Sequence, residues 1–188
     1  MRKLVPFALV ALVCMAPSQS RAQTMIEAGG EVGYTSSNVN DWLGRGVFAP
    51  DHLNYGANAL VLFGRRGAGG LQIGGEFGYR RLLGYSYVDG GETLDATVDA
   101  LRLLILTRFW FNDGAWFGEA SAGVERIDGI RGFNAVKDPT LGLAAGTFFD
   151  LSDSFAIVAK ARGTVIFDSG SPIATIGLIT GGSYSLGR

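Results

Sequence analysis

The chain has 188 residues, of which 47% are hydrophobic and 18% are charged, and its formal net charge is −1 at pH 7. This near-neutral balance, without a basic patch interleaved with aromatic residues, argues against nucleic acid as a partner. The 29 glycines and five prolines argue against both a collagen and a disordered linker, which are richer in proline.

The first 22 residues have the layout of a Sec-type signal peptide. Arg2 and Lys3 form a positive start, residues 4–15 form an apolar segment of 12 residues, and Ala22 ends a Ser-Arg-Ala cleavage sequence. A membrane-spanning helix needs about 20 apolar residues, so the segment is too short for an anchor. We therefore predict a signal peptide at 1–22 and one mature domain at 23–188.

Cys14 lies within this segment and is the only cysteine of the chain. A lipoprotein signal also places a cysteine after an apolar run, but Val13 stands where such signals carry a small residue. Cleavage after Ala22 removes the cysteine and three basic residues, which leaves 13 basic and 17 acidic residues and a net charge of −4. The mature domain therefore forms no disulfide and depends on strand pairing and packing.

Charged residues and glycines recur at every second position along the apolar stretches of the mature chain. In the first stretch Glu27 and Glu31 fall in one phase, whereas Ile26 and Val32 fall in the other. Period two indicates strands with one polar and one apolar face. Repeated behind a secretion signal, this pattern is what a membrane-spanning barrel needs, with lipid outside and a polar lumen inside.

The alternation predicts eight strands, separated by connections of alternating length. We expect the strands at Met25–Ser36, Tyr55–Gly64, Leu71–Tyr85, Leu94–Phe111, Ala115–Ile127, Thr140–Asp150, Ser154–Phe167 and Ile173–Leu186. Ser37–Asn54, Ser86–Thr93 and Asp128–Pro139 are the longer connections, whereas 65–70, 112–114 and 151–153 are short. Long loops at one end and tight turns at the other are typical of outer-membrane barrels. The predicted fold is all-β, an eight-stranded antiparallel up-and-down transmembrane β-barrel.

Aromatic residues concentrate near the ends of the predicted strands. The tight-turn end has Phe63, Phe109, Trp110, Phe111, Trp116, Phe117, Phe148, Phe149, Phe155 and Tyr184, and the loop end has Tyr34, Tyr55, Tyr79, Tyr85, Tyr87 and Phe167. Two such bands predict aromatic girdles at the two lipid–water interfaces. Ordinary core aromatics are the alternative, but they need no concentration at strand ends.

If the polar phase faces inward, the lumen receives five acids and five bases. They are Glu27, Glu31, Glu76, Glu119, Glu125, Arg80, Arg102, Arg108, Lys160 and Arg162. The interior of an eight-stranded barrel is only wide enough for side chains, and buried charge is costly unless it is paired. We therefore predict that these residues pair with one another and close the lumen.

A soluble periplasmic barrel of lipocalin type is the competing fold, with polar residues outside and an apolar binding cavity inside. The aromatic bands, the lack of a disulfide and a charged fraction of 18%, against a typical ~25%, favour the membrane barrel.

Two stretches, Gly29–Tyr34 and Gly74–Arg80, resemble strands of the bacterial outer-membrane β-barrel domain family, which includes the transmembrane domain of outer-membrane protein A. Its members end in an aromatic last strand that the barrel assembly machinery reads. The segment containing Gly181, Tyr184 and Leu186 is similar to this assembly signal, although Leu186 replaces the usual phenylalanine and two more residues follow. The resemblance covers essentially the whole mature chain and implies an outer-membrane location.

One loop carries the only histidine of the chain, His52, next to Asp51 and near Ser36 and Ser37 in sequence. Some small outer-membrane barrels cut or transfer lipid A acyl chains with a Ser-His-acid triad, which makes a lipid-modifying enzyme one alternative. No serine here lies in a recognisable catalytic setting, so we predict no catalytic residue.

A second loop carries Asp89, Glu92, Asp95 and Asp99. Such a cluster could attract divalent cations, but its spacing is not that of a calcium loop. We predict a solvated acidic loop, with no metal site and no cofactor.

These observations predict a small integral outer-membrane barrel that is not an enzyme. Its role would be structural or in surface interactions, its lumen would be plugged by charges, and it would be a monomer. Its partners would be outer-membrane lipid and lipopolysaccharide and, during biogenesis, the barrel assembly machinery. The alternative of another class is a narrow pore for small solutes.

Overall fold

The computed structural model describes residues 23–36, 47–111, 114–128, 136–167 and 172–186, most of which lie in strands. The strands are β1 (Gln23–Ser36), β2 (Val47–Asp51), β3 (Leu53–Gly64), β4 (Leu71–Asp89), β5 (Glu92–Phe111), β6 (Trp116–Asp128), β7 (Val136–Asp150), β8 (Phe155–Ile166) and β9 (Ile173–Leu186). The predicted signal peptide and most of the predicted turn at 112–114 lie outside the described residues. No helix in the described ranges is long and apolar enough to cross a membrane.

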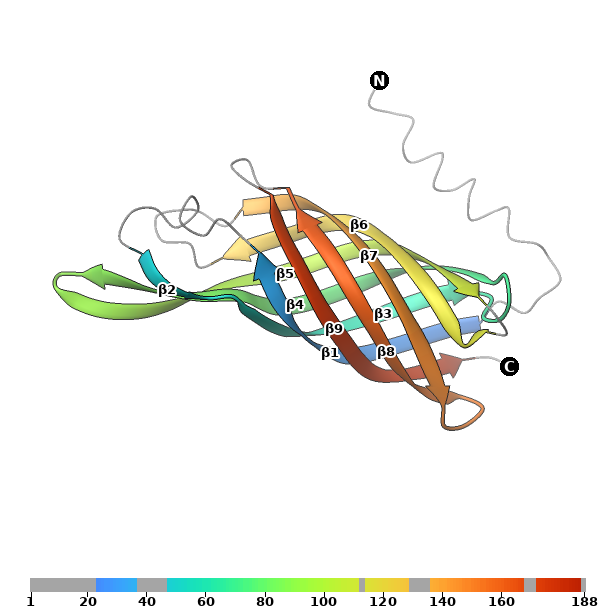
Figure 1. Cartoon of the computed structure of the whole chain (residues 1–188). Helices are drawn as coiled ribbons and strands as arrows, with labels where there is room; N and C mark the ends of the chain where they lie inside the picture. The colour runs from blue at the N-terminus through green and yellow to red at the C-terminus, as the bar shows by residue number, and fades with distance from the viewer. Residues whose placement is uncertain (1–22, 37–46, 112–113, 129–135, 168–171, 187–188) are drawn as a thin grey trace, which may run out of the picture.

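Eight of the strands form a closed antiparallel ring. β1 pairs with β3 and β9, the order continues through β8, β7 and β6 to β5, and β5 closes the ring by pairing with β4. Figure 1 shows the tilted strands wrapped into one barrel, with the start of β1 and the end of β9 at the same end. The predicted eight-stranded antiparallel barrel is therefore confirmed.

The prediction of a loop at Ser86–Thr93 is wrong. Strands β4 and β5 continue through this segment as a long hairpin, with Ser86 opposite Asp95. The chain turns at Gly90 and Gly91, whose φ angles are 61° and 89°. A two-residue hairpin turn of this kind needs positive φ at both positions, which glycine adopts without strain. The hairpin projects well beyond the ring at the loop end (green, Figure 1).

Two other predicted loops also contain strand. β2 lies within the segment 37–54 and pairs with β4 beyond the start of β3, with Asp51 opposite Gly84. β3 begins at Leu53, so that only His52 separates it from β2. β7 begins at Val136, inside the segment predicted as the loop 128–139.

A bulge interrupts the ladder between β4 and β5. Arg81 lies opposite Asp99 and Leu83 lies opposite Val98, so Leu82 is an extra residue on β4. Such a bulge bends a strand and redirects the side chains that follow it. As a result, Leu82 and Leu83 are both buried at the loop end of the barrel.

Side chains alternate between the interior and the outer surface as the period-two pattern predicts. On β5, Leu101, Leu103 and Ile105 are 39%, 61% and 55% exposed, whereas Arg102 and Arg108 are buried. The strands β3 and β7 show the same alternation of buried and exposed side chains. The outer surface is therefore mostly apolar, as a lipid-facing surface must be.

The interior is apolar at both ends, which the sequence reasoning missed. The turn-end cluster consists of Met25, Leu60, Leu62, Leu106, Trp110, Phe117, Phe148, Ala156 and Val158. The loop-end cluster consists of Leu82, Leu83, Tyr85, Val98, Ala100, Ile127, Ile166 and Ile173. These two clusters lie on either side of the charged middle of the lumen.

Four aromatic residues assigned to the girdles therefore face inward. Trp110, Phe117, Phe148 and Tyr85 are at most 6% exposed. The first three pack ring against ring at centroid distances of 5.0–5.5 Å, and the indole N–H of Trp110 donates to Gln72 Oε1 at 2.9 Å. The other aromatics that are exposed still form bands at the two ends; they include Phe63, Phe109, Phe111, Trp116, Phe149, Phe155, Tyr184, Tyr34, Tyr55, Tyr79 and Phe167.

Candidate functional site

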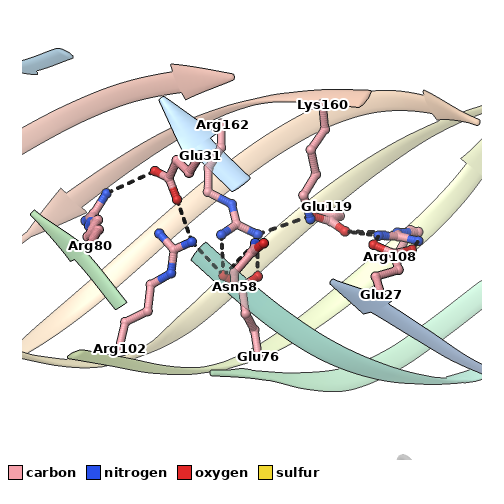
Figure 2. A network of polar contacts seen from close by, with 10 residues as sticks. All are labelled: Glu27, Glu31, Asn58, Glu76, Arg80, Arg102, Arg108, Glu119, Lys160 and Arg162. Atoms are coloured by element: carbon pink, nitrogen blue, oxygen red, sulfur yellow. Dashed lines mark hydrogen bonds and ion pairs between the residues drawn. The ribbon is translucent and has the colours of Figure 1, made fainter. Parts of the chain in front are cut away.

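All ten charged residues predicted for the lumen lie in the interior of the barrel. None of them is more than 6% exposed. They come from five strands: β1 (Glu27, Glu31), β4 (Glu76, Arg80), β5 (Arg102, Arg108), β6 (Glu119, Glu125) and β8 (Lys160, Arg162). Asn58 of a sixth strand, β3, also contacts Glu76. Figure 2 shows these side chains, except that of Glu125, together with Asn58, extending into the interior and forming a row of contacts along it.

The half of this network nearer the loop end is built on two arginines that share one carboxylate. Arg80 binds both oxygens of Glu125 at 2.8 and 2.9 Å, and its Nη1 lies 3.4 Å from Glu31 Oε1. Arg102 lies 2.6 Å from the other oxygen of Glu31 and 2.9 Å from Glu76. Glu31 thus contacts both guanidinium groups, and Arg102 also contacts Glu76.

The half nearer the tight turns centres on Glu119. Arg162 binds Glu76 through two hydrogen bonds of 2.6 and 2.5 Å and lies 3.5 Å from Glu119. Lys160 and Arg108 also bind Glu119, at 2.8 and 2.5 Å. Arg108 finally binds Glu27 through both carboxylate oxygens. The ten side chains therefore form one continuous series of ion pairs along the lumen.

Burial explains why the pairing is so extensive. A charge removed from water costs several kcal/mol, roughly, unless a partner and further hydrogen bonds compensate it. Each of the ten side chains has at least one opposite charge within 4.0 Å. The five acids and five bases also balance, so this group of ten carries no net charge.

The charged middle is joined directly to the turn-end cluster. The guanidinium of Arg108 lies 4.2 Å from the ring centre of Phe117, and those of Trp110 and Phe148 are 5.6 and 5.3 Å away. These distances allow cation–π attraction, which is stronger away from water. Arg108 thus couples ion pairing to aromatic packing.

A second arginine covers the same aromatic rings from the tight-turn side. The guanidinium of Arg66 lies 5.1 Å from Trp110 and 4.8 Å from Phe148. It also binds Asp150 through two hydrogen bonds of 2.7 and 2.9 Å. Arg66 belongs to the turn between β3 and β4, whereas Asp150 ends β7, so this contact ties two sides of the ring together across its opening.

The sequence contained a usable signal for these interior aromatics. Trp110 falls in the same phase as Arg108 on β5, and Phe117 falls in the same phase as Glu119 on β6. This shared phase alone predicts that both rings face the interior, whereas their position near a strand end suggested the girdles. Nothing in the sequence pattern predicted the role of Arg66, because it lies in a turn.

The three residues of the predicted assembly signal lie on β9. Tyr184 and Leu186 are 49% and 44% exposed on the outer surface. Gly181 lies opposite Gly29 of β1, and a Cβ at this position would lie 2.2 Å from the backbone oxygen of Ala28. A glycine is therefore required for the close approach of the first and last strands.

His52 lies away from any catalytic arrangement in the described part of the chain. Its Nδ1 is 2.9 Å from the backbone oxygen of Thr35, and its ring packs on Tyr34 at 5.2 Å. Ser36 is exposed at the end of β1, and Ser37 lies outside the described residues. The contacts of His52 stabilise the junction between β2 and β3.

The four acidic residues of the second loop lie along the projecting hairpin and not in one cluster. Asp95 accepts a hydrogen bond from Ser86 and Asp99 accepts one from Thr97, at 2.6 and 3.2 Å. Among the described residues, no three acidic, histidine or cysteine side chains are arranged to hold a metal ion.

No protein-family model and no curated protein matches this sequence. Solved structures match its fold. Neisserial surface protein A matches with a TM-score of 0.60 at 12% identity, covering 89% of this chain and 100% of that chain. Ail, the attachment invasion locus protein of Yersinia pestis, matches with a TM-score of 0.55 at 13% identity, covering 89% and 100%. The outer membrane protein OprG from Pseudomonas aeruginosa matches with 0.51 at 9%, covering 89% and 97%. The chain thus has the fold of small eight-stranded outer-membrane barrels.

Proposed function

We propose that this chain is a small, non-enzymatic outer-membrane barrel with a closed lumen, and that it acts through the surface at its loop end. The observation that carries the proposal is the filling of the interior. Ten paired charges occupy the middle, an apolar cluster occupies each end, and Arg66 lies across the tight-turn opening. A solute pathway would require all of these layers to rearrange.

The projecting hairpin of β4 and β5 is the proposed contact surface. β6 pairs with β5 only up to Asp99, so within the described residues the outer edge of β5 beyond this point has no partner. Val88 and Leu94 are 51% and 38% exposed there. Unpaired strand edges and exposed apolar side chains are features that proteins use for recognition.

The charge of the hairpin limits the class of partner. The segment 82–101 contains four carboxylates and no basic residue. One solved structure similar to this chain is that of Ail in complex with the heparin analogue sucrose octasulfate, which is an anionic ligand. The acidic hairpin of this chain would repel such an anion, so the proposed partner is not anionic.

The proposed location and biogenesis follow from the outer surface and the last strand. We propose that residues 1–22 are removed as a signal peptide and that the barrel is a monomer surrounded by outer-membrane lipid and lipopolysaccharide. Gly181, Tyr184 and Leu186 would be read by the barrel assembly machinery. A catalytic role is not proposed, since His52 contacts a backbone oxygen and an aromatic ring.

Two measurements on one preparation test this proposal. The mature chain should fractionate with outer membranes, resist carbonate extraction and change its gel mobility on boiling. In planar bilayers it should show no stable conductance, because the lumen is closed. Recovery in the soluble periplasmic fraction would support the lipocalin-like alternative, and porin-like conductance would support the pore.

A further inference from the structure

A concave site of about 450 Å³ lies at the base of the projecting hairpin. The residues that line it include Asp51, Arg81, Gly84, Ser86, Asp95 and Thr97. Ser86 is opposite Asp95, and Gly84 is opposite both Thr97 and Asp51, so that these residues share the outward face of the sheet. The lumen network contributes no residue to this site.

Three local irregularities build the site. The bulge at Leu82 shifts the register just after Arg81. The short strand β2 then adds Asp51 beside Gly84. Finally, a Cβ on Gly84 would lie only 2.0 Å from Arg81 Nη2. The guanidinium can therefore lie over this position only because residue 84 is a glycine.

The guanidinium of Arg81 is held by several contacts, but not all of its N–H donors have a hydrogen-bond partner. Its Nη1 donates to the Tyr55 hydroxyl and its Nη2 donates to Asp51 Oδ2, both at 3.2 Å, and its guanidinium lies 5.5 Å from the Tyr55 ring centre. Its Nε is buried and has no hydrogen-bond partner in the described part of the chain. The two Nη groups carry four N–H donors, of which the bonds to Tyr55 and Asp51 use two. The Arg81 side chain is 23% exposed, so its guanidinium has further donors for a ligand oxygen.

The opposite wall of the site offers an acceptor. Asp95 is exposed and accepts a hydrogen bond from the Ser86 hydroxyl through Oδ1. Within the described residues its second carboxylate oxygen is available to a ligand. Two carboxylates and one guanidinium give the site a net charge of −1. This charge disfavours a phosphate or sulfate and favours a ligand that carries a positive group together with neutral oxygens.

We propose that this site binds an amino sugar through its free amine and its ring hydroxyls. The ammonium group pairs with Asp95, and a hydroxyl oxygen accepts an N–H from an Nη group of Arg81. Sugar hydroxyls both donate and accept, which matches a lining that contains guanidinium, hydroxyl and carboxylate groups. The volume is in the range of small-molecule sites. This proposal does not depend on whether the lumen conducts.

The test is calorimetric titration of the folded mature chain in phosphocholine micelles, since maltoside detergents would themselves present sugars. Three probes are compared: a glucosamine tetramer with free amines, the same tetramer fully N-acetylated, and sucrose octasulfate. We expect saturable binding of the first, binding weaker by about tenfold or more for the second, as for the loss of one charge-assisted hydrogen bond, and none for the third. Equal binding of the two tetramers, or no saturable binding of the first, would overturn the proposal.

Matched variants distinguish binding at this site from a general attraction of the amine to the acidic hairpin. Asp95→Asn should weaken binding of the free-amine tetramer by about tenfold. Glu92→Gln removes the same charge from the same strand outside the site and should leave binding unchanged. Gly84→Ala should displace the Arg81 guanidinium and weaken binding, while heat-modifiable mobility confirms that the barrel is folded. If Glu92→Gln weakens binding as much as Asp95→Asn, the amine is attracted by the hairpin as a whole and the site is refuted.

Discussion

The carboxylates of the lumen differ in how many cations each one contacts, and this number should rank the cost of removing them. Glu119 lies within 4.0 Å of Arg108, Lys160 and Arg162. Among the ion pairs of the described residues, Glu125 contacts only Arg80, which keeps Glu31 as a second partner. Loss of one buried partner typically costs about 3–5 kcal/mol. Glu119→Gln should therefore lower the free energy of unfolding by about this amount, and Glu125→Gln by less.

Urea unfolding of the barrel in lipid vesicles measures both variants. The double variant Glu119→Gln with Lys160→Met should be more stable than Glu119→Gln alone, because it also removes one of the cations left unpaired. Equal losses for Glu119→Gln and Glu125→Gln would show that the number of cation contacts does not govern the cost.

The outer surface allows a second comparison between single residues. Ile105 and Leu101 lie on the same face of β5 and are 55% and 39% exposed, but Leu101 lies closer to the loop end, where its neighbours across the strands are Tyr79 and Arg126. An arginine on the lipid face costs about 2–4 kcal/mol at the bilayer midplane and about 0–1 kcal/mol near the interface. Ile105→Arg should therefore destabilise the barrel clearly more than Leu101→Arg in vesicle unfolding. The reverse order would place the midplane elsewhere on β5.

At the scale of elements, the projecting hairpin should behave independently of the ring. Beyond Asp99, β5 pairs only with β4 within the described residues, and the turn depends on positive φ at Gly90 and Gly91. Gly91→Val should strain this turn, since a β-branched residue does not adopt positive φ readily. We expect faster hydrogen exchange in the hairpin at 86–95 and an unchanged unfolding midpoint of the barrel. Replacing Gly90-Gly91 by Asn-Gly, which suits the same turn, is the control and should change neither quantity.

The strands of the ring could be predicted because each one separates polar from apolar residues at period two. Arg102 and Arg108 on β5 fixed the inward face of that strand, and Leu103 and Ile105 fixed the outward face. The positions of the ten lumen charges follow from this alternation alone. Their pairing partners did not, because each pair depends on strand register and side-chain reach across the barrel.

The elements that the sequence reasoning missed are those in which alternation is broken or polar. The hairpin beyond Tyr85 has polar residues on both faces of its tip, so that Ser86–Thr93 resembled a loop. The bulge at Leu82 puts two neighbouring leucines on the same side, which no period-two pattern reveals. The apolar ends of the lumen were missed because closeness to a strand end was weighed above phase at Trp110 and Phe117.

At the scale of the whole molecule, closure of the lumen is spread over several layers. The charged middle lies between the turn-end and loop-end clusters, and Arg66 covers the first of them. Apolar layers resist the entry of water even where the charges between them rearrange. The ion pairs are therefore not the sole barrier to ions.

This arrangement predicts how conductance responds to substitutions. Glu76→Ala alone should lower stability but leave planar bilayers without stable conductance, because both apolar clusters persist. Trp110→Ala with Arg66→Ala should open the turn end and also fail to conduct, since the ion pairs and the loop-end cluster persist. Only variants that open both ends and disrupt the charged middle, such as Trp110→Ala and Leu83→Ala combined with Glu76→Ala, should show ion flow. If Glu76→Ala alone conducts, the charges are the only barrier, and the apolar clusters serve packing rather than closure.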